Sequence, residues 1–189
     1  MKIIKTKIEE LFIIEPDVFG DDRGFFVETY NKERYVEGGI DMEFVQDNLS
    51  KSTKGVLRGL HYQKEPYAQG KLVQVVAGSV LDVAVDIRHD SKTFGQWVSV
   101  ELSEKNKKQF WIPAGFAHGF VALEDNTIFS YKCTNLYNKE SESAIIWDDT
   151  DLNIDWQLKK HNINKPIISE KDQKNVAFID IGKNFVLKN

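Results

Sequence analysis

The chain has 189 residues, of which 41% are hydrophobic and 12% aromatic, and its formal net charge is −4. This composition is sufficient to fill a core, which excludes a disordered chain, and the length suits a single domain over residues 1–189. The charge balance excludes a nucleic-acid partner bound through a broadly basic face, although a small anionic ligand needs only a few local cations.

Cysteine use and hydropathy indicate the compartment. Cys133 is the one cysteine, so no disulfide can form within the chain, which fits a reducing environment. The first 17 residues carry a charge every few positions and lack the apolar run of a signal peptide. No stretch approaches the 18 apolar residues of a membrane span. We therefore expect a soluble cytoplasmic protein without a membrane partner.

Strands dominate the predicted secondary structure. In chain order they are expected at 25–30, 46–48, 56–63, two runs within 71–88, 96–102, 109–113, 119–123, 127–133 and 144–149. The Ala77-Gly78-Ser79 junction predicts a β-hairpin between the two runs of 71–88. Many short, evenly spaced strands indicate an all-β sandwich or closed barrel.

Helical signals are few. Residues 31–39 predict a short helix that is capped by Asn31 and stopped by Gly38-Gly39, and a second helix could begin within residues 169–175. The chain after about residue 155 is more polar, and we expect it to wrap around the barrel.

The stretch VLRGLHYQ (56–63) places one histidine, His61, in a predicted strand. A second histidine two positions later would suggest a metal site, but Gln63 stands there. A metal needs three or four convergent ligands, and neither His61 nor His118 has a histidine or cysteine at i+2 or i+4. We expect no metal. A two-histidine site with a distant carboxylate stays open, as does a buried histidine with a purely structural role.

Polar residues gather around this strand. Alternation places His61 and Gln63 on one face and Arg58 on the other, but a bulge near Gly59 could bring Arg58 to the same cavity. A barrel interior with these side chains and Lys71 would be destabilised unless each polar group had a partner. Small barrels use such polarity to bind a ligand.

Eight stretches of the chain together resemble the dTDP-4-dehydrorhamnose 3,5-epimerase family of the cupin superfamily. They are VFGDDRGFFVETYN (18–31), FVQDNLSKS (44–52), VLRGLHYQ (56–63), AQGKLVQVVAGSVLDVAVDIR (68–88), SKTFGQWVSVELS (91–103), FWIPAGFAHGF (110–120), YKCTNLY (131–137) and EKD (170–172). The resemblance implies a cupin-type jelly-roll barrel with a few short peripheral helices and a dTDP-sugar substrate.

The implied reaction is epimerisation at C3 and C5 of dTDP-4-dehydro-6-deoxy-D-glucose to dTDP-4-dehydro-L-rhamnose, in dTDP-L-rhamnose biosynthesis. Both carbons flank the C4 ketone. Their protons leave only if a base removes them, the enolate oxygen is stabilised, and an acid returns a proton to the opposite face. No redox step is involved, so we expect no cofactor.

The resemblance implies four catalytic residues: His61 as base, Asp172 as its orienting partner, Tyr131 as acid and Lys71 beside the enolate oxygen. An imidazole suits proton transfer near neutral pH, and a phenol with a pKa near 10 is protonated at rest. The residues alone leave other interpretations open. Asp172 fits a helix capping box that begins at Ser169, Tyr131 fits a barrel tyrosine with a satisfied hydroxyl, and Lys71 fits an exposed lysine at a strand start.

The resemblance also implies a set of substrate-binding residues that hold the diphosphate, the sugar and the thymine. These are Arg23, Phe26, Glu28, Gln46, Asn48, Arg58, Lys71, His118, Tyr137, Glu142 and Lys171. Arg23, Arg58 and Lys171 are candidates for the phosphates and sugar, and Phe26 or Tyr137 for stacking on the base. We expect His118 just past a Pro-Gly turn at the barrel mouth.

The segment 18–30 predicts an edge strand that pairs with a second subunit. The resemblance implies a homodimer in which Arg23, Phe26 and Glu28 complete the partner's site. Three other functions stay open: epimerisation at only C3 or C5 of a related dTDP-4-keto-6-deoxy sugar, a metal-dependent cupin oxygenase, and a sugar-nucleotide binding module without catalysis.

Overall fold

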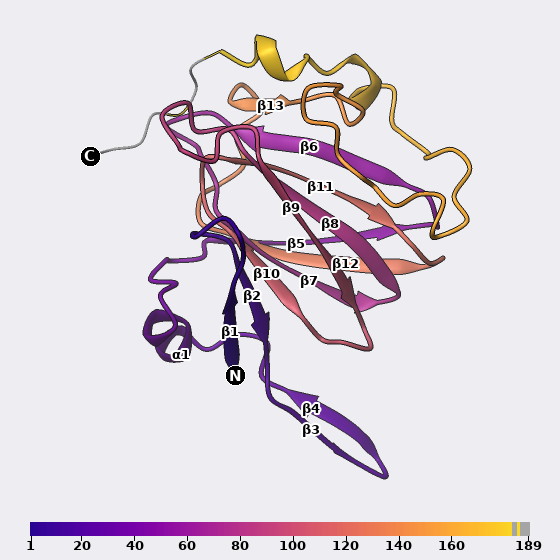
Figure 1. The fold of residues 1–189 in the computed structure, drawn as a ribbon. Helices are drawn as coiled ribbons and strands as arrows, with labels where there is room; N and C mark the ends of the chain where they lie inside the picture. Colours follow the sequence, from indigo (N-terminus) through magenta and orange to yellow (C-terminus); the bar gives the residue numbers. More distant parts are fainter. Residues whose placement is uncertain (183–184, 186–189) are drawn as a thin grey trace.

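The computed structural model describes residues 1–182 and 185, and two antiparallel sheets face one another in it (Figure 1). One sheet has the order β1 (Lys2–Lys5), β2 (Phe12–Glu15), β10 (Gln109–Ile112), β7 (Lys71–Ala77), β12 (Thr127–Cys133) and β5 (Gln46–Ser52). The other has the order β13 (Glu142–Ala144), β6 (Leu57–Gln63), β11 (Phe116–Ala122), β8 (Ser79–Asp86) and β9 (Trp97–Ser103). The predicted all-β fold is confirmed.

Three short helices and a hairpin complete the described elements. The hairpin of β3 (Val18–Asp21) and β4 (Gly24–Val27) projects from the body of the molecule. The helices are α1 (Lys32–Glu37), η1 (Asp172–Lys174) and η2 (Phe178–Asp180). Helix α1 begins and ends as predicted, because the Asn31 side chain accepts the Arg34 N–H and Gly38 caps the last turn. Within the described chain, no helix is long and apolar enough to cross a membrane.

The main core lies between the two sheets, where alternate residues of each strand point inward. Along β9, Val98, Val100 and Leu102 are buried while the residues between them are more exposed, as the alternation predicted. They pack in one cluster with Phe110, Phe129 and other apolar residues of the facing sheet. This core holds the two sheets at a fixed spacing, which also sets the distance across any cavity between them.

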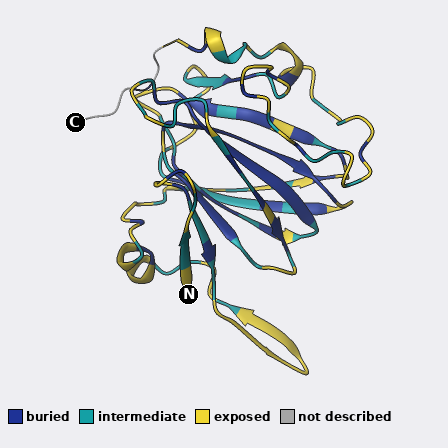
Figure 2. Cartoon of the chain, in the orientation of Figure 1, coloured by how far each residue is buried: buried dark blue, intermediate teal, exposed yellow. Residues whose placement is uncertain are grey.

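The C-terminal segment covers the outer face of the five-stranded sheet (Figure 1, orange and yellow). Leu152, Trp156 and Ile163 pack there against β6 residues such as Leu57 and Tyr62. All residues of β8 are therefore buried, which Figure 2 shows as a continuous blue strand. The expectation that the tail wraps the barrel is confirmed, and this segment carries η1 across β6.

Three sequence predictions about strands were wrong. The segment 18–30 is not a single edge strand, because a turn at residues 22–23 folds it into the β3–β4 hairpin, which ends at Val27. Residues 71–88 do form two strands, but they are not a hairpin: β7 pairs with β10 and β12, whereas β8 pairs with β9 and β11 in the opposite sheet. Gly78, at φ +75°, turns the chain from one sheet to the other. The strand predicted at 144–149 is limited to β13 and an isolated bridge from Ile145 to Val176. Beyond Ile145, apolar side chains pack under the C-terminal segment without pairing in a sheet.

A β-bulge interrupts β6 beside its histidine. Two residues, Gly59 and Leu60, separate Arg58 from His61, whereas Gly119 alone separates their partners on β11. A Cβ on Gly59 would lie 2.6 Å from the Gly119 Cα, so a side chain at this position would push the strands apart. The extra residue brings Arg58 and His61 to the same face, as the bulge predicted near Gly59 would do.

That shared face points toward the six-stranded sheet. Phe120, the β11 partner of Arg58, stacks on Phe129 of β12 with ring centroids 4.2 Å apart. His118, the partner of His61, lies 6.1 Å from the same ring. Both Arg58 and His61 therefore face the space between the sheets.

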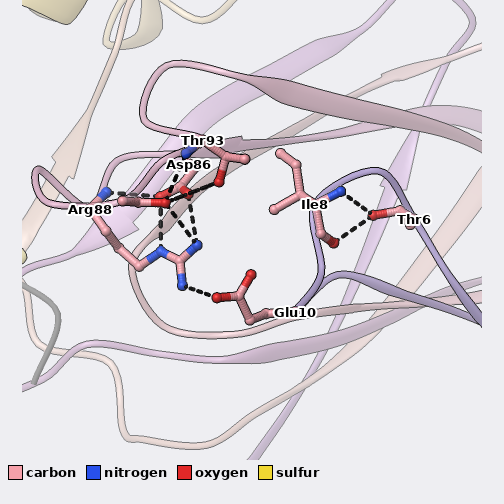
Figure 3. Close-up of polar contacts among 7 residues, drawn as sticks. Thr6, Ile8, Glu10, Asp86, Arg88 and Thr93 are labelled. Atoms are coloured by element: carbon pink, nitrogen blue, oxygen red, sulfur yellow. Dashed lines mark hydrogen bonds and ion pairs between the residues drawn. The ribbon is translucent and has the colours of Figure 1, made fainter. Parts of the chain in front are cut away.

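A buried ion pair joins the sheets near the end of β8 (Figure 3). Arg88 donates to both carboxylate oxygens of Asp86, at 2.9 and 2.7 Å, and to Glu10 of the β1–β2 segment at 2.8 Å. Ser91 and Thr93 each donate to Asp86 at 2.6 Å. Burial raises the Asp86 pKa, but these hydrogen bonds together outweigh it and hold the pKa below its usual value.

We predict that Arg88→Ala lowers the free energy of unfolding by about 3–5 kcal/mol, because it leaves a buried carboxylate without a cation. Since Asp86 has a depressed pKa in the folded state, its stabilising contribution is present above about pH 4 and is lost as pH falls through the folded pKa. The deficit of the variant should therefore shrink at low pH. Urea titrations at several pH values measure it.

Arg34→Ala is the matched control, because Arg34 is exposed and its contact with Glu28 is 3.4 Å long. It should cost less than about 1 kcal/mol. Equal losses for the two variants would contradict a special role for the buried pair.

Candidate active site

A pocket of about 270 Å³ lies between the two sheets. Seven predicted site residues line it: Gln46, Asn48, His61, Lys71, Tyr131, Tyr137 and Glu142. Tyr62, Gln63, Gln69 and Cys133 complete the lining. Strands β5, β7 and β12 of the larger sheet supply one wall, and β6 and β13 supply the other.

His61 is held by a buried carboxylate at the back of this pocket. Its Nε2 lies 2.7 Å from Oδ1 of Asp172, whose side chain is only 6% exposed. An ionised carboxylate can only accept a hydrogen bond, so Nε2 carries the proton. In a neutral imidazole the lone pair is then on Nδ1, which is the nitrogen available to take a proton.

Asp172 keeps its charge in this setting. Burial raises its pKa, but the hydrogen bond and charge of His61 outweigh burial and leave the pKa below its usual value. The Asp172 N–H donates to Ser169 Oγ at 3.1 Å in the turn before η1, but the cap residue of η1 is Lys171, and this helix has no side-chain capping hydrogen bond from the described residues. Asp172 thus begins η1 with its backbone while its side chain contacts His61.

Tyr131 faces the pocket from the other sheet. It lies on β12, between Val73 of β7 and Asn48 of β5 in the strand register. Burial raises the pKa of its phenol, which Arg58 opposes in part, so the group is protonated at rest and can donate. The imidazole and the phenol therefore approach the same cavity from opposite walls.

Lys71 begins β7 and is the lysine among the described residues that line the pocket. Burial lowers the pKa of its ammonium group, while the nearby Cys133, Asp82 and Glu142 act in the opposite direction. A cation with little surrounding water stabilises a developing negative charge more strongly than an exposed one does.

Three predicted binding residues meet at the rim. Glu142 accepts from the Tyr137 hydroxyl at 3.0 Å and from Lys171 Nζ at 2.6 Å. Tyr137 is half exposed, so its ring offers an open aromatic face. Gln63 fixes the loop that carries it, by donating to the Leu136 carbonyl and accepting from the Asn138 N–H. Gln63 thus has a structural role in place of the second metal ligand that an HxH pattern would need.

The sequence predicted His118 at the barrel mouth, and this prediction was wrong. Strand β11 starts at Phe116, directly after the turn, so His118 is already inside a strand and is buried. Its Nε2 contacts both carboxylate oxygens of Asp82 at 3.0 and 2.9 Å. It is absent from the pocket lining. Arg58 is also outside the lining, and it bridges to β5 through Ser52 Oγ at 3.3 Å.

Three predicted residues of the N-terminal region lie away from the pocket of their own chain. Arg23 is at the tip of the β3–β4 hairpin and pairs with Asp21. Phe26 is 68% exposed on β4. Glu28 accepts from Asn31 and Arg34 beside α1.

Gln69 and Cys133 line the pocket but were not predicted as site residues. Cys133 lies two residues after Tyr131, so strand alternation alone places it on the same face. Gln69 lies in a loop and donates to the Asn135 carbonyl at 2.7 Å. Strand or helix periodicity in the sequence does not predict a contact of this kind. Among the described residues, no group of three or more His, Cys, Asp or Glu could hold a metal ion.

A family model described as dTDP-4-dehydrorhamnose 3,5-epimerase matches residues 5–180. The protein of that name from Shigella flexneri is 56% identical over 181 residues, which cover 95% of this chain and 97% of the relative.

Two solved structures are also similar. The first is a dTDP-6-deoxy-D-glucose-3,5-epimerase from Legionella pneumophila Philadelphia 1 in complex with dTDP-4-keto-L-rhamnose, at TM-score 0.94, 52% identity and coverage of 100% and 99% of the two chains. The more distant second is a 3'-monoepimerase from Streptomyces bikiniensis in complex with dTDP-quinovose, at TM-score 0.88, 30% identity and coverage of 96% and 92%.

We predict that neutral His61 is protonated on Nε2 in at least about ten of every eleven molecules, because a hydrogen bond to a charged group contributes about 1.5–3 kcal/mol. Long-range proton–nitrogen NMR correlations report this tautomer directly. Asp172→Asn should reduce the preference, whereas Glu170→Gln, at an exposed carboxylate two residues earlier, should leave it unchanged. A dominant Nδ1–H form in the wild type would contradict the geometry.

Proposed function

Because the chain belongs to the dTDP-4-dehydrorhamnose 3,5-epimerase family, we propose that it epimerises C3 and C5 of dTDP-4-dehydro-6-deoxy-D-glucose, giving dTDP-4-dehydro-L-rhamnose for dTDP-L-rhamnose biosynthesis. The observation that carries this proposal is that His61 and Tyr131 line one pocket from opposite sheets, with His61 backed by Asp172. This arrangement suits removal of a proton from one face of a sugar ring and its return to the other.

In the proposed mechanism, Nδ1 of His61 takes the proton from the carbon beside the ketone. Asp172 accepts from Nε2–H throughout and stabilises the imidazolium that forms. Electrons of the broken C–H bond move onto the ketone oxygen, where the Lys71 ammonium offsets the enolate charge. Tyr131 then donates its proton to the opposite face of the carbon, and proton exchange with solvent restores both groups.

The rim residues suit the nucleotide part of this ligand. Lys171 offers a cation for phosphate, and the half-exposed Tyr137 ring offers a stacking surface for a pyrimidine. Neither His118 nor Arg58 lines the described pocket. We propose that the exposed Arg58 side chain breaks its hydrogen bond to Ser52 and contacts the ligand. We also propose that His118 does not contact the ligand and instead stabilises the strands around the pocket through its contact with Asp82.

The β3–β4 hairpin supports a homodimer. Phe19, Phe25 and Phe26 are 64%, 59% and 68% exposed on it, and Figure 2 shows the hairpin as the longest exposed projection. Exposed aromatic residues grouped in this way are typical of interaction surfaces. We propose that Arg23, Phe26 and Glu28 reach the partner's pocket, because a hairpin that projects from its own subunit is free to enter a neighbour.

We predict that the protein transfers deuterium from D₂O into both C3 and C5 of the substrate, as measured by NMR of the product. His61→Asn should reduce exchange at both carbons by about 10²–10⁴-fold, which is the usual loss for a general base, while dTDP binding changes little. Tyr131→Phe should still exchange deuterium but should invert the centres slowly. Inversion of both centres at the wild-type rate by Tyr131→Phe would exclude the proposed acid.

The count of labelled carbons separates the related functions. Label at only C3 or C5 would indicate a mono-epimerase, which the 30% identical monoepimerase makes a specific alternative. Binding of dTDP without any label would indicate a binding module. Stoichiometric iron, nickel or manganese in the purified protein would favour an oxygenase.

We also predict a particle of twice the 21.8 kDa chain mass by light scattering at micromolar concentration. Phe26→Glu should shift the population toward monomer, because it places a charge in the proposed apolar contact. Val36→Glu, at an exposed apolar residue of α1, is the control outside the hairpin. A monomeric wild type would contradict the proposed assembly.

A further inference from the structure

Cys133 is a pocket residue to which the proposed mechanism gives no task. It ends β12 between Lys71 of β7 and Gln46 of β5, and it is 1% exposed. Burial raises the pKa of its thiol, and Lys71 opposes this only in part. The thiol is therefore neutral at physiological pH, so it does not neutralise the adjacent ammonium group.

A chain of hydrogen bonds runs along this wall and ends at the thiol. The Tyr137 N–H donates to Gln46 Oε1 at 2.9 Å. The Gln46 Nε2 donates to Asn48 Oδ1 at 3.1 Å, and the Asn48 Nδ2 donates to Cys133 Sγ at 3.5 Å. The two amides and the thiol all line the pocket.

The direction of this chain is fixed by its first member. A backbone N–H can only donate, so the oxygen of Gln46 must face Tyr137 and its nitrogen must face Asn48. The oxygen of Asn48 must then face Gln46, because two amide nitrogens would otherwise oppose each other. The nitrogen of Asn48 is left facing the sulfur, which accepts weakly and without charge.

The consequence is a pocket wall that offers donors to a ligand. Each amide nitrogen has two hydrogens, and only one of each pair is used within the chain. None of the hydrogen bonds of the described residues uses the second hydrogens of Gln46 and Asn48, and both amides line the pocket together with Lys71. Such a surface complements acceptor oxygens, which a nucleotide sugar carries on its phosphates, its carbonyls and its pyrimidine.

We propose that Cys133 is a positioning residue that ends this one-way chain as an uncharged acceptor, and that together with the Tyr137 N–H at the other end it holds Gln46 and Asn48 as donors to the acceptor oxygens of the ligand. The ligand class rests on the proposed function. A carboxylate in the same place would also accept from Asn48, but it would pair with Lys71. A group with no lone pair would leave the Asn48 nitrogen without this acceptor, so the amide would be held only by its bond from Gln46.

The test compares Cys133→Ala, which removes the acceptor, with Cys133→Ser, which keeps one. We expect Cys133→Ala to raise the Kd for dTDP, measured by calorimetry, and the KM for the nucleotide sugar by about 3- to 10-fold, as for a neutral hydrogen bond. The kcat should stay within about 2-fold. Cys133→Ser should stay within about 2-fold of wild type in all three quantities.

Wild-type binding by Cys133→Ala would overturn the proposal, as would an equal loss in Cys133→Ser, which would indicate simple packing. A fall in kcat at unchanged KM would also overturn it. If circular dichroism shows that Cys133→Ala does not fold, Cys133→Val replaces it as the variant without a lone pair. Wild-type protein that binds dTDP without exchanging protons would overturn the proposed function, while the Kd comparison still decides the role of Cys133. Wild-type protein that does not bind dTDP would overturn both.

Discussion

The hydrogen bond between His61 and Asp172 imposes the strongest constraint on this structure, because a carboxylate buried to 6% exposure must find a donor. Asp172 is 111 residues away from His61 in the sequence. The C-terminal segment must therefore cross the outer face of the five-stranded sheet to deliver it. The same crossing buries apolar residues of β6 and β8, so one path of the chain serves both the core and the site.

The bulge in β6 determines that the side chains of both Arg58 and His61 point into the space between the two sheets. Regular alternation would have turned one of the two outward. With the extra residue at Gly59–Leu60, both face the six-stranded sheet, which supplies Tyr131 and Lys71. The closeness of Gly59 to Gly119 explains why neither position has room for a side chain. Sheet geometry, rather than loop flexibility, thus sets the imidazole opposite the phenol.

Strand positions could be predicted from the sequence because alternation and turn residues are local signals. Helix α1, β9 and β12 follow from them almost residue by residue. Strand partners could not be predicted in this way. A glycine at position 78 is equally compatible with a hairpin turn and with a turn that takes the chain from one sheet to the other. The apolar residues after Ala144 pack against the C-terminal segment without forming a strand. The candidate site residues came from resemblance more than from pattern, because on the residues alone Asp172 fits a helix cap, and His118, which lies outside the pocket lining, fits a turn.

The polar groups that surround Lys71 in the pocket are mostly paired with one another. The carboxylates are paired with cations or donors, and the amides are hydrogen-bonded to neutral groups. Asp172 and Glu142 are each paired with a cation or donor, and Glu142 and the buried Asp82 act on Lys71 only through their charge. On the opposite wall, two amides and a thiol satisfy each other without any net charge. A carboxylate on that wall would lower the energy of the ammonium group in the empty pocket and so reduce what a bound enolate could gain from it. In the proposed mechanism, a neutral wall leaves that interaction for the state in which negative charge develops on the ligand, where it would accelerate proton transfer.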